Sequence, residues 1–431
     1  MKYNFDKEIP VIAETDVLIV GGGPGGVSAG IMAARQGVDV LVVERYGCLG
    51  GMAAFGEVSP FMRNHVNGET LDKPVYVDIC RKLWEKHPPA ARLAFPFNEK
   101  VAAGAISKDE VILAMEELLL EAGAKILYHH TLVDVICVDK NIQAAIFHSK
   151  SGFAAIKAKT FIDSTGDGDL AVLAGCPFEI GNNDGFCQPM TTCFKLSGVN
   201  VKAMPPRIKI SEIYNEARKA GKIDCPRENV LFFSYFESDI IHFNTTRVVK
   251  KSGVNGLDLS AAEMEGRRQV REFIDFLRNE IPGFENARLH SIAHHIGVRE
   301  SRRILGLVYQ TAQDFINAAK FPDGVVKANY TIDIHNPSGT GTTIMEMPLS
   351  DWYEIRYGAL IPRECNNLLM GCRAISVDHE LHSSCRVMPP VCSIGQAAGM
   401  AAAMCCQKNC LPAELKGEDV RKKLVQSGAS L

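Results

Sequence analysis

The chain has 431 residues, of which 46% are hydrophobic and 23% are charged, and its formal net charge is −3. This length exceeds that of one ordinary domain, and the composition is typical of a globular protein. A charge close to zero excludes a general electrostatic attraction to nucleic acid or anionic lipid, and no stretch is long and apolar enough to span a membrane. We therefore expect neither a nucleic-acid partner nor a membrane partner.

Residues 16–44 predict a strand, a glycine-rich turn, a helix and a second strand that ends on an acidic residue. The first strand, at 16–20, runs into Gly21-Gly-Gly-Pro24-Gly25-Gly26, and the second strand, at 38–43, ends on Glu44. This is the pattern G-x-G-x-x-G in its complete βαβ context. The sequence therefore predicts a dinucleotide-binding unit.

The residues of this pattern have distinct physical roles. Gly21 permits the tight turn, Gly23 lets the backbone approach a pyrophosphate, and Gly26 lets the helix lie against the strand. The N-terminus of the helix offers unpaired N–H groups and a partial positive charge to the phosphates. Glu44 is placed to accept hydrogen bonds from a ribose diol.

A helix and a series of strands are predicted between residues 107 and 174. Ser107 and Glu110 have the spacing of a capping box, and Gly123 ends the helix. Apolar patterning then predicts an antiparallel meander and its flanking elements, with strands at 125–128, 131–138, 143–148, 153–157 and 159–163 and a short helix at 170–174.

The sequence Gly166-Asp167-Gly-Asp-Leu-Ala171 also matches G-x-G-x-x-A after a strand. A second dinucleotide site, for instance for NADPH, is one interpretation, and an acidic turn is another. No strand ending in an acid follows about 20 residues later, as the fingerprint requires. We therefore expect a loop that closes over the same cofactor, with Asp167 hydrogen-bonded to a ribityl or pyrophosphate group.

The pattern changes between about residues 187 and 344, where strands are mixed with charged helices at 211–220 and 261–279. Acids alternate with arginines in the second of these helices, which is typical of a solvated face. After residue 360, a strand at 367–370, a polar loop and a small-residue helix at 393–404 return to the first pattern. The central segment is therefore predicted to be an inserted substrate domain.

Fourteen cysteines are scattered along the chain without a C-x-x-C pair. Zinc sites need paired ligand spacing, and Cys48 lacks a nearby partner for a redox-active disulfide. Several cysteines, including Cys80, Cys137, Cys392 and Cys405, lie in apolar periodic segments. They predict buried, reduced thiols in a cytoplasmic protein.

Five motifs stand in the same order as in a known family: residues 21–26 with Glu44, 50–52, 163–169, 298–303 and 386–399. Over nearly its whole length, the chain resembles the bacterial FAD-dependent oxidoreductases. These are flavoproteins of the glutathione-reductase type, related to the fumarate reductase and succinate dehydrogenase flavoprotein group. The resemblance implies FAD as the cofactor; its FAD motifs are specific, whereas its substrate region is not.

The resemblance also implies which residues would hold FAD. The AMP half would lie on Gly21, Gly23, Pro24, Gly25, Gly26 and Glu44. The pyrophosphate and ribityl chain would lie near Arg45, Gly50, Gly51, Met52, Thr165, Gly166 and Asp167. The backbone of Val133, on the first strand of the meander, would meet the adenine.

The small-residue helix near the C-terminus is a candidate for flavin contact. It follows two adjacent prolines, which suit a helix start. Gly395, Ala397 and Ala398 keep its first turns bare, so a flat ring can approach, and its N-terminus would stabilise an anionic reduced flavin. The alternative is a buried Ala/Gly helix used only for tight packing; the resemblance favours the flavin interpretation.

His379, His382 and Arg386 form a candidate catalytic cluster just before this helix. The resemblance implies that a His and an Arg here bind a substrate carboxylate or transfer protons. Histidine titrates near neutral pH, and arginine binds carboxylates through two hydrogen bonds. The glycine pair that precedes the His in the fumarate reductase relatives is missing, and the alternative is that His382 and Arg386 only brace the loop.

A second cluster, at residues 294–303, also has two interpretations. It can form a wall facing the substrate, or Arg299 and Arg303, one helical turn apart, can pair with acids such as Glu300. We favour the structural interpretation. The pair at 129–130, two histidines, is predicted to lie on the surface without a role.

Together these patterns predict an α/β fold: a Rossmann-like FAD-binding domain with an antiparallel β-meander, and an inserted mixed α+β substrate domain. Residues 1–185 and 346–431 would form the FAD-binding domain, and 186–345 the substrate or cap domain. The predicted activity is FAD-dependent oxidation or reduction of a small organic substrate by hydride transfer at flavin N5, without a metal.

Two alternatives remain at this point: a protein whose flavin is structural or regulatory, and a flavin-dependent RNA-modifying enzyme. The near-neutral charge and the absence of a basic tract disfavour the RNA-modifying enzyme. The electron donor or acceptor stays open, as does assembly into a homo-oligomer.

Overall fold

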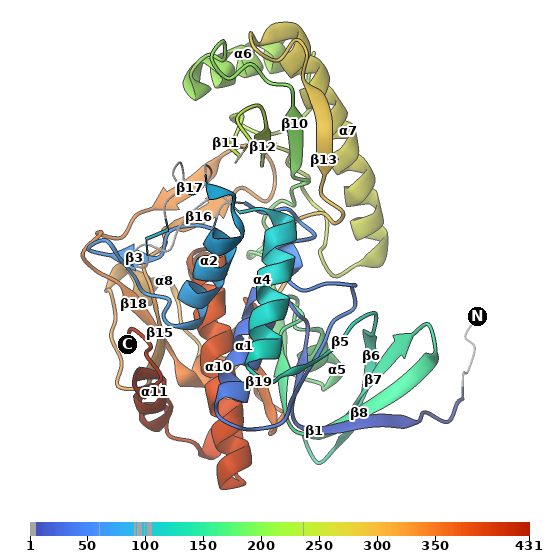
Figure 1. The fold of residues 1–431 in the computed structure, drawn as a ribbon, viewed down its shortest axis with the longest axis vertical. Helices are drawn as coiled ribbons and strands as arrows, with labels where there is room; N and C mark the ends of the chain where they lie inside the picture. Colours follow the sequence, from blue (N-terminus) through green and yellow to red (C-terminus); the bar gives the residue numbers. More distant parts are fainter. Residues whose placement is uncertain are drawn as a thin grey trace.

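The structure is a computed structural model that describes residues 6–59, 61–89, 92, 97–98, 100, 106–235 and 237–431. A seven-stranded sheet with the order β5-β2-β1-β8-β7-β6, in which β19 also pairs with β8, forms one end of the molecule (Figure 1). Its strands are β1 (Val11–Val20), β2 (Val40–Val43), β5 (Lys125–Leu127), β6 (Thr131–Val138), β7 (Asn141–Ser149), β8 (Gly152–Asp163) and β19 (Leu368–Met370).

The sheet combines a parallel part with an antiparallel hairpin. Strands β5, β2, β1, β8 and β19 run parallel, and Val20 of β1 lies opposite Val43 and Asp163. Strands β6, β7 and β8 are antiparallel. Because the parallel strands end together, the turn after β1, the acid after β2 and the loop after β8 meet at one edge, where α/β proteins bind their ligands.

Helices α1 (Pro24–Arg35), α4 (Lys108–Glu121) and α10 (Met388–Lys408) pack on the parallel part and bury its apolar residues in one large core. Helix α2 (Val75–Lys86) packs on α4 and α10, and α11 (Gly417–Gln426) packs on α10. Helix α10 lies along α1 in the centre of the molecule, although 352 residues of chain separate the two (Figure 1). The N- and C-terminal segments therefore build one unit.

A second sheet lies at the opposite end of the molecule, under α6 (Arg207–Lys219) and α7 (Gly256–Glu280) (Figure 1). We call it the cap sheet; its antiparallel order is β11-β12-β10-β13. Its strands are β10 (Phe194–Ser197), β11 (Phe232–Ser234), β12 (Ile241–Phe243) and β13 (Arg288–Ile292). A separate core of aromatic residues, including Phe194, Phe243 and Phe273, joins it to the two helices.

Short elements connect these two parts. The strands are β3 (His65–Val66), β4 (Glu69–Thr70), β9 (Phe178–Ile180), β14 (Arg302–Ile304), β15 (Gly324–Ala328), β16 (Ile332–His335), β17 (Thr342–Met345) and β18 (Tyr353–Arg356). The helices are η1 (Gly51–Ala53), α5 (Asp169–Leu173), α8 (Ala312–Ile316), η2 (Tyr357–Leu360), α9 (His379–Cys385) and η3 (Pro412–Glu414). Residues of β14, α8, β15 and β16 belong to the large core rather than to that of the cap sheet. The domain boundaries at 185/186 and 345/346 stay a prediction.

The α/β fold class, the βαβ unit and the meander are confirmed, but several local predictions were wrong. The strands predicted at 153–157 and 159–163 are one strand, β8. The polar loop predicted before the C-terminal helix contains α9, whose N-cap Asp378 accepts a hydrogen bond from Leu381 N. Helix α10 begins at Met388, because its two prolines occupy the first turn, where no intrahelical N–H is needed.

Two further details differ from the sequence-based expectation. Ser107 is the N-cap of α4, but its side chain does not close the predicted capping box. None of the fourteen cysteines, all of which lie in the described residues, forms a disulfide. Cys137, predicted to be buried, is exposed because it lies on the edge strand β6.

Within the described residues, no single helix is long and apolar enough to cross a membrane. The pair α9 and α10, bent by 93°, passes that test by length and composition only, and most of its residues are buried in the protein core.

Candidate functional site

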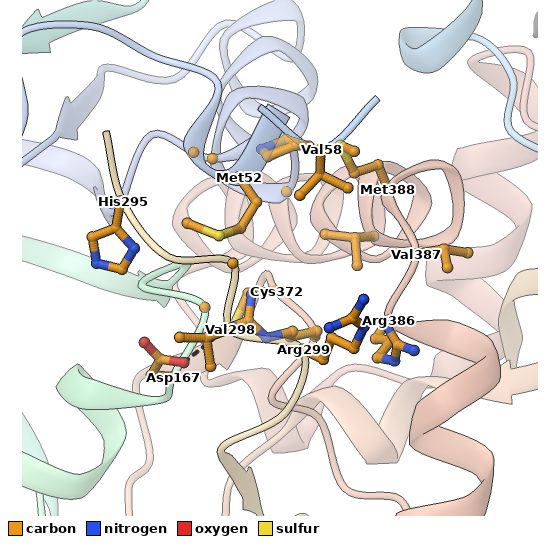
Figure 2. Close-up of a pocket in the computed structure, with 18 of the residues that line it drawn as sticks. Met52, Val58, Asp167, His295, Val298, Arg299, Cys372, Arg386, Val387 and Met388 are labelled. Carbon is orange, nitrogen blue, oxygen red and sulfur yellow. Dashed lines mark hydrogen bonds and ion pairs between the residues drawn. The ribbon is translucent and has the colours of Figure 1, made fainter. Parts of the chain in front are cut away.

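A cavity of about 500 Å³ lies where the parallel strands end, between the large sheet, the cap sheet and the start of α10. Its lining comes from the glycine-rich turn, the ends of β2 and β8, η1, the start of β6, the cap segment 227–233, the segment 295–299 and the hairpin β16–β17. Figure 2 shows Met52, Val58 and Met388 on one wall, and Asp167, Cys372 and Arg299 across from them.

The glycine-rich turn brings backbone to the cavity wall. Gly21 has φ +103°, and a Cβ on it would lie 2.3 Å from the carbonyl oxygen of Ser164. A Cβ on Gly51 would lie 2.9 Å from Cα of Gly23. Only glycine fits these close contacts, and the result is an open cradle of backbone at the N-terminus of α1.

Glu44 is held rigidly beside this cradle. Its Oε2 accepts a hydrogen bond from Gly22 N at 2.6 Å, and its Oε1 accepts one from Tyr46 N at 2.9 Å. The side chain is 5% exposed and lines the cavity. Since each carboxylate oxygen has further lone pairs, Glu44 can still accept hydrogen bonds from a bound ribose.

The loop after β8 is fixed by Asp163. Its carboxylate accepts hydrogen bonds from Thr165 N, Thr165 Oγ1 and Ala171 N. Burial raises the pKa of Asp163 to about 6, although these bonds oppose the rise. Thr165, Gly166 and Asp167 thereby line the same cavity as the glycine-rich turn.

Asp167 is paired within the protein. Its Oδ1 accepts hydrogen bonds from Arg373 Nη2 at 2.7 Å and from Ser301 Oγ at 2.6 Å. Arg373 also lines the cavity, and its buried Nε has no hydrogen-bond partner among the described residues. The guanidinium of Arg373 lies against Gly166, and its positive charge on this wall suits an anionic group of a cofactor.

These features fit the cofactor that the resemblance implies. The cradle at Gly23 and Gly51 leaves room for a pyrophosphate, Glu44 suits a ribose, and Arg373 supplies an unsatisfied donor. The loop at 165–167 closes over the same cavity, as expected for a single cofactor.

The structure brings most of the predicted cofactor residues together, but not all of them. Those that line the cavity are Gly21, Gly23, Pro24, Gly25, Glu44, Arg45, Gly51, Met52, Thr165, Gly166 and Asp167. Gly26 and Gly50 lie behind the wall and shape the turns: a Cβ on Gly26 would lie 1.9 Å from Gly21 O, and Gly50 has φ +105°.

Val133 is not among the residues that line the cavity, whereas its neighbours Thr131 and Leu132 are. The register of β6 against β7 shifts between Leu132 and Asp134, so Val133 is the extra residue of a bulge. The contact between the Val133 backbone and the adenine stays a prediction.

Gly395, Ala397 and Ala398 do not line the cavity, contrary to the flavin-contact interpretation. A Cβ on Gly395 would lie 1.9 Å from Gly25 O, which makes the glycine a packing residue between α10 and α1. The first turn of α10 meets the cavity through Val387, Met388 and Val391. Because residues 389 and 390 are prolines, this turn has fewer free N–H groups than usual.

His379 and His382 do not line the cavity either, whereas Arg386 does. His379 Nδ1 lies 2.7 Å from Glu300 Oε1. His382 is fully buried, and burial together with nearby arginines, foremost Arg303, lowers its pKa well below the ordinary value. Arg386 Nη2 donates to Gln188 Oε1 at 3.3 Å, and its Nε is buried without a described partner.

Part of the segment 294–303 agrees with the structural interpretation, and part of it lines the cavity. It is not helical before β14, so Arg299 and Arg303 do not lie one helical turn apart. Arg303 Nη1 pairs with Glu300 at 2.6 Å, as the structural interpretation expects. His295 and Arg299, in contrast, line the cavity.

Several cavity residues were missed by sequence reasoning. His130, expected on the surface, lines the cavity, and its backbone N–H donates to the carbonyl oxygen of Glu44 at 3.1 Å. Arg227, Asp333 and His335 come from the cap and the hairpin β16–β17. No motif marks them; the even spacing of 333 and 335 on a short strand is the one signal that both side chains share a face.

Two of the three histidines that line the cavity, His295 and His335, have opposite hydrogen-bonding capacity. His295 Nδ1 lies 2.6 Å from the carbonyl oxygen of Ile296 and must donate, which leaves Nε2 of the neutral ring as an acceptor. His335 Nδ1 lies 3.0 Å from Arg247 Nη2 and must accept, so its Nε2 carries the proton. Burial, followed by the nearby arginines, lowers the pKa of His335 well below its ordinary value and keeps this ring neutral.

No group of three or more His, Cys, Asp or Glu side chains in the described part of the chain could hold a metal ion.

Comparison with known proteins gives a family match and partial relatives. Residues 16–424 match the family model described as FAD dependent oxidoreductase. The thiamine thiazole synthase of Methanococcus aeolicus is 31% identical over 168 residues, 36% of this chain and 55% of the relative. That of Methanococcus vannielii is 31% identical over 175 residues, 38% of this chain and 61% of the relative. The chain thus spans less than two thirds of the length of these relatives.

Solved structures with a similar fold include two that cover nearly the whole chain. A geranylgeranyl bacteriochlorophyll reductase-like protein from Thermoplasma acidophilum is 14% identical with a TM-score of 0.47, over 97% of this chain and 84% of that one. The L-proline dehydrogenase of P. horikoshii is 12% identical with a TM-score of 0.42, over 97% of this chain and 99% of that one.

Proposed function

Because the chain belongs to the FAD dependent oxidoreductase family, we propose that this cavity holds its FAD beside a small organic substrate. The chemistry that FAD supplies when bound is hydride exchange with a substrate carbon at flavin N5. The observation that carries the proposal is the single cavity, which joins the glycine cradle to a wall of polar side chains from the cap. The similarity to thiamine thiazole synthase covers 36% of the chain, and we do not extend that reaction to this protein.

We assign cofactor binding to the residues that line the dinucleotide end of the cavity. The cradle at Gly23 and Gly51 would receive the pyrophosphate, and Glu44 would receive the ribose. Val387, Met388 and Val391, at the start of α10, would form an apolar wall that excludes water from the reacting carbon.

We assign proton transfer to His295 rather than to His379 or His382. His295 lines the cavity, and Nε2 of its neutral ring can accept a proton that leaves the substrate. Arg386 also reaches the cavity and is assigned to substrate binding.

The test starts from the visible spectrum of the purified protein, which should show bound flavin. The protein is then bleached anaerobically with hydroxy acids, enoates, amines and sugars in turn. For any substrate found, His295→Gln should lower turnover about a hundredfold and Arg386→Gln at least tenfold, both with FAD retained. His382→Leu should keep both the yellow colour and the turnover. A colourless, folded protein that does not take up added FAD would refute the proposal.

A further inference from the structure

The cap end of the cavity carries a cluster of cationic side chains with few partners. We propose that this cluster, Arg227, Arg299 and Arg386, binds the carboxylate of a small monocarboxylic acid whose other end is apolar. This names the substrate class for the proposed function and rests on it.

The first observation is an excess of buried positive charge. Arg247 is neutralised locally, since its Nη2 lies 3.1 Å from Glu228 Oε2 and its Nη1 donates to two backbone carbonyls. Arg227, Arg299 and Arg386 remain, with Asp333 as the carboxylate among them on the cavity wall. Burying a charge without a counter-ion is costly, and a bound anion removes much of that cost.

The second observation is that, among the described residues, Arg299 hydrogen-bonds only to neutral groups. It donates to Pro189 O at 2.7 Å and to Asn244 Oδ1 at 3.3 Å, and its third partner is the hydroxyl of Thr191. Burial, followed by repulsion from Arg227, Arg386 and Arg247, lowers the pKa of Arg299 to about 9. A negative ligand in the cavity would relieve this repulsion.

The third observation is a set of unsatisfied donors. Arg227 is 3% exposed, and its Nη1 is buried without a partner among the described residues; its Nε donates to Asn229 Oδ1 at 3.3 Å. Arg386 Nε is likewise buried without a partner among the described residues. These two buried N–H groups leave part of the positive charge of the arginines uncompensated. His335 adds a neutral donor at Nε2, 3.7 Å from Asp333 Oδ2, on the same cavity wall.

Apolar residues on part of the remaining wall favour an acid whose other end is apolar. Leu231, Phe233 and Ile344 line the cavity near these arginines and offer no hydrogen bond to a second charged group. Ile344 lies opposite Asp333 in the hairpin β16–β17, so the apolar and polar parts of the wall adjoin.

The test uses the FAD-loaded protein and three ligands: phenylacetate, its neutral isostere phenylacetamide, and inorganic phosphate. Binding is read from the change in the flavin absorption spectrum and from the melting temperature of the holoprotein. We expect phenylacetate to perturb the spectrum and raise the melting temperature, and the amide to do neither at the same concentration. Equal responses to the acid and the amide would overturn the inference, as would tighter binding of phosphate than of phenylacetate.

Matched variants locate the binding. Arg299→Gln and Arg227→Gln should each raise the dissociation constant of phenylacetate at least tenfold without lowering the FAD content. Arg271→Gln, on the exposed face of α7, should leave it unchanged. If the variants bind phenylacetate as wild type does, the cluster is not the site. Failure of the proposed function has a different signature, namely protein that contains no flavin.

Discussion

A Cβ atom on Gly395 would lie 1.9 Å from the carbonyl oxygen of Gly25, so helices α10 and α1 touch backbone to backbone. One turn later, a Cβ on Gly399 would lie 2.2 Å from Ala29 O. The N-terminal residues of both helices line the same cavity. This contact therefore fixes the distance between the glycine cradle and the apolar wall at the start of α10.

We expect Gly395→Ala to destabilise the protein by about 3 kcal/mol, because backbone cannot yield to the added methyl group as a flexible side chain can. The free energy of unfolding, measured in urea, checks this. Gly256→Ala is the matched control: it lies at the start of α7 with nothing within 4 Å of the new Cβ, and should be neutral or slightly stabilising. Equal stabilities of the two variants would contradict the packing role.

We expect Glu44→Gln to weaken FAD binding about tenfold to a hundredfold. The glutamine amide can accept from only one of the two N–H groups, of Gly22 and Tyr46, that the carboxylate now holds. The substitution also weakens the hydrogen bond to the ribose that is assigned to the same side chain, and this adds to the loss of FAD affinity. Titration of the apoprotein with FAD measures the dissociation constant, and Glu364→Gln, at an exposed ion pair with Lys140, serves as control. An unchanged affinity would remove Glu44 from the cofactor site.

The dinucleotide unit could be predicted from the sequence because its signal is local. Gly21, Gly26 and Glu44 lie within one βαβ unit. The conformation or chemistry that each position requires can be inferred from the strand, turn and helix that surround it in the sequence. The contact of the Val133 backbone with the adenine stays a prediction. The bulge at this residue of β6 could not be predicted, since a bulge leaves no mark in an apolar alternation.

The substrate end of the cavity could not be predicted in this way. Arg227, Arg299 and Arg386 lie far apart along the chain. They meet only in the folded protein, where the cap segment, the segment 295–299 and the start of α10 line one cavity. The near-neutral net charge conceals such a local excess. His382 lies outside the cavity lining, in a short helix of which every residue except Glu380 is buried, and the sequence does not show this burial.

We expect Glu300→Gln to destabilise the protein by about 3–5 kcal/mol, because it leaves the buried guanidinium of Arg303 without its main counter-ion. Glu300 is 1% exposed; its Oε1 holds Arg303 Nη1 and His379 Nδ1, and its Oε2 accepts from Gln188 N. Thermal and urea unfolding measure the effect. Glu179→Gln removes the half-exposed second partner of the same arginine and should cost less than about 1 kcal/mol. Similar losses of unfolding free energy in both variants would show that the buried ion pair contributes no more to stability than the half-exposed one.

Asp72 should make the stability of the protein fall as the pH rises from about 4 to about 7. Its side chain is buried, and burial raises its pKa from 3.8 to about 7, although Ser393 and Asn64 hydrogen-bond to it. Below the unfolded pKa both states hold the proton. As the pH rises further, the unfolded chain releases the proton while the folded chain still retains it, so the unfolded state is favoured progressively until the folded pKa is passed.

Asp72→Asn should therefore flatten this part of the pH profile. The amide reproduces the protonated acid: its oxygen can accept from Asn64 Nδ2, and its NH₂ can donate to the hydroxyl of Ser393. Relative to wild type, the variant should gain up to about 4 kcal/mol between pH 4 and pH 8. Urea unfolding at these two pH values measures the difference, and the exposed Asp419→Asn controls for the general effect of removing one acid. Parallel profiles for wild type and Asp72→Asn would show that Asp72 is ionised in the folded protein throughout this range.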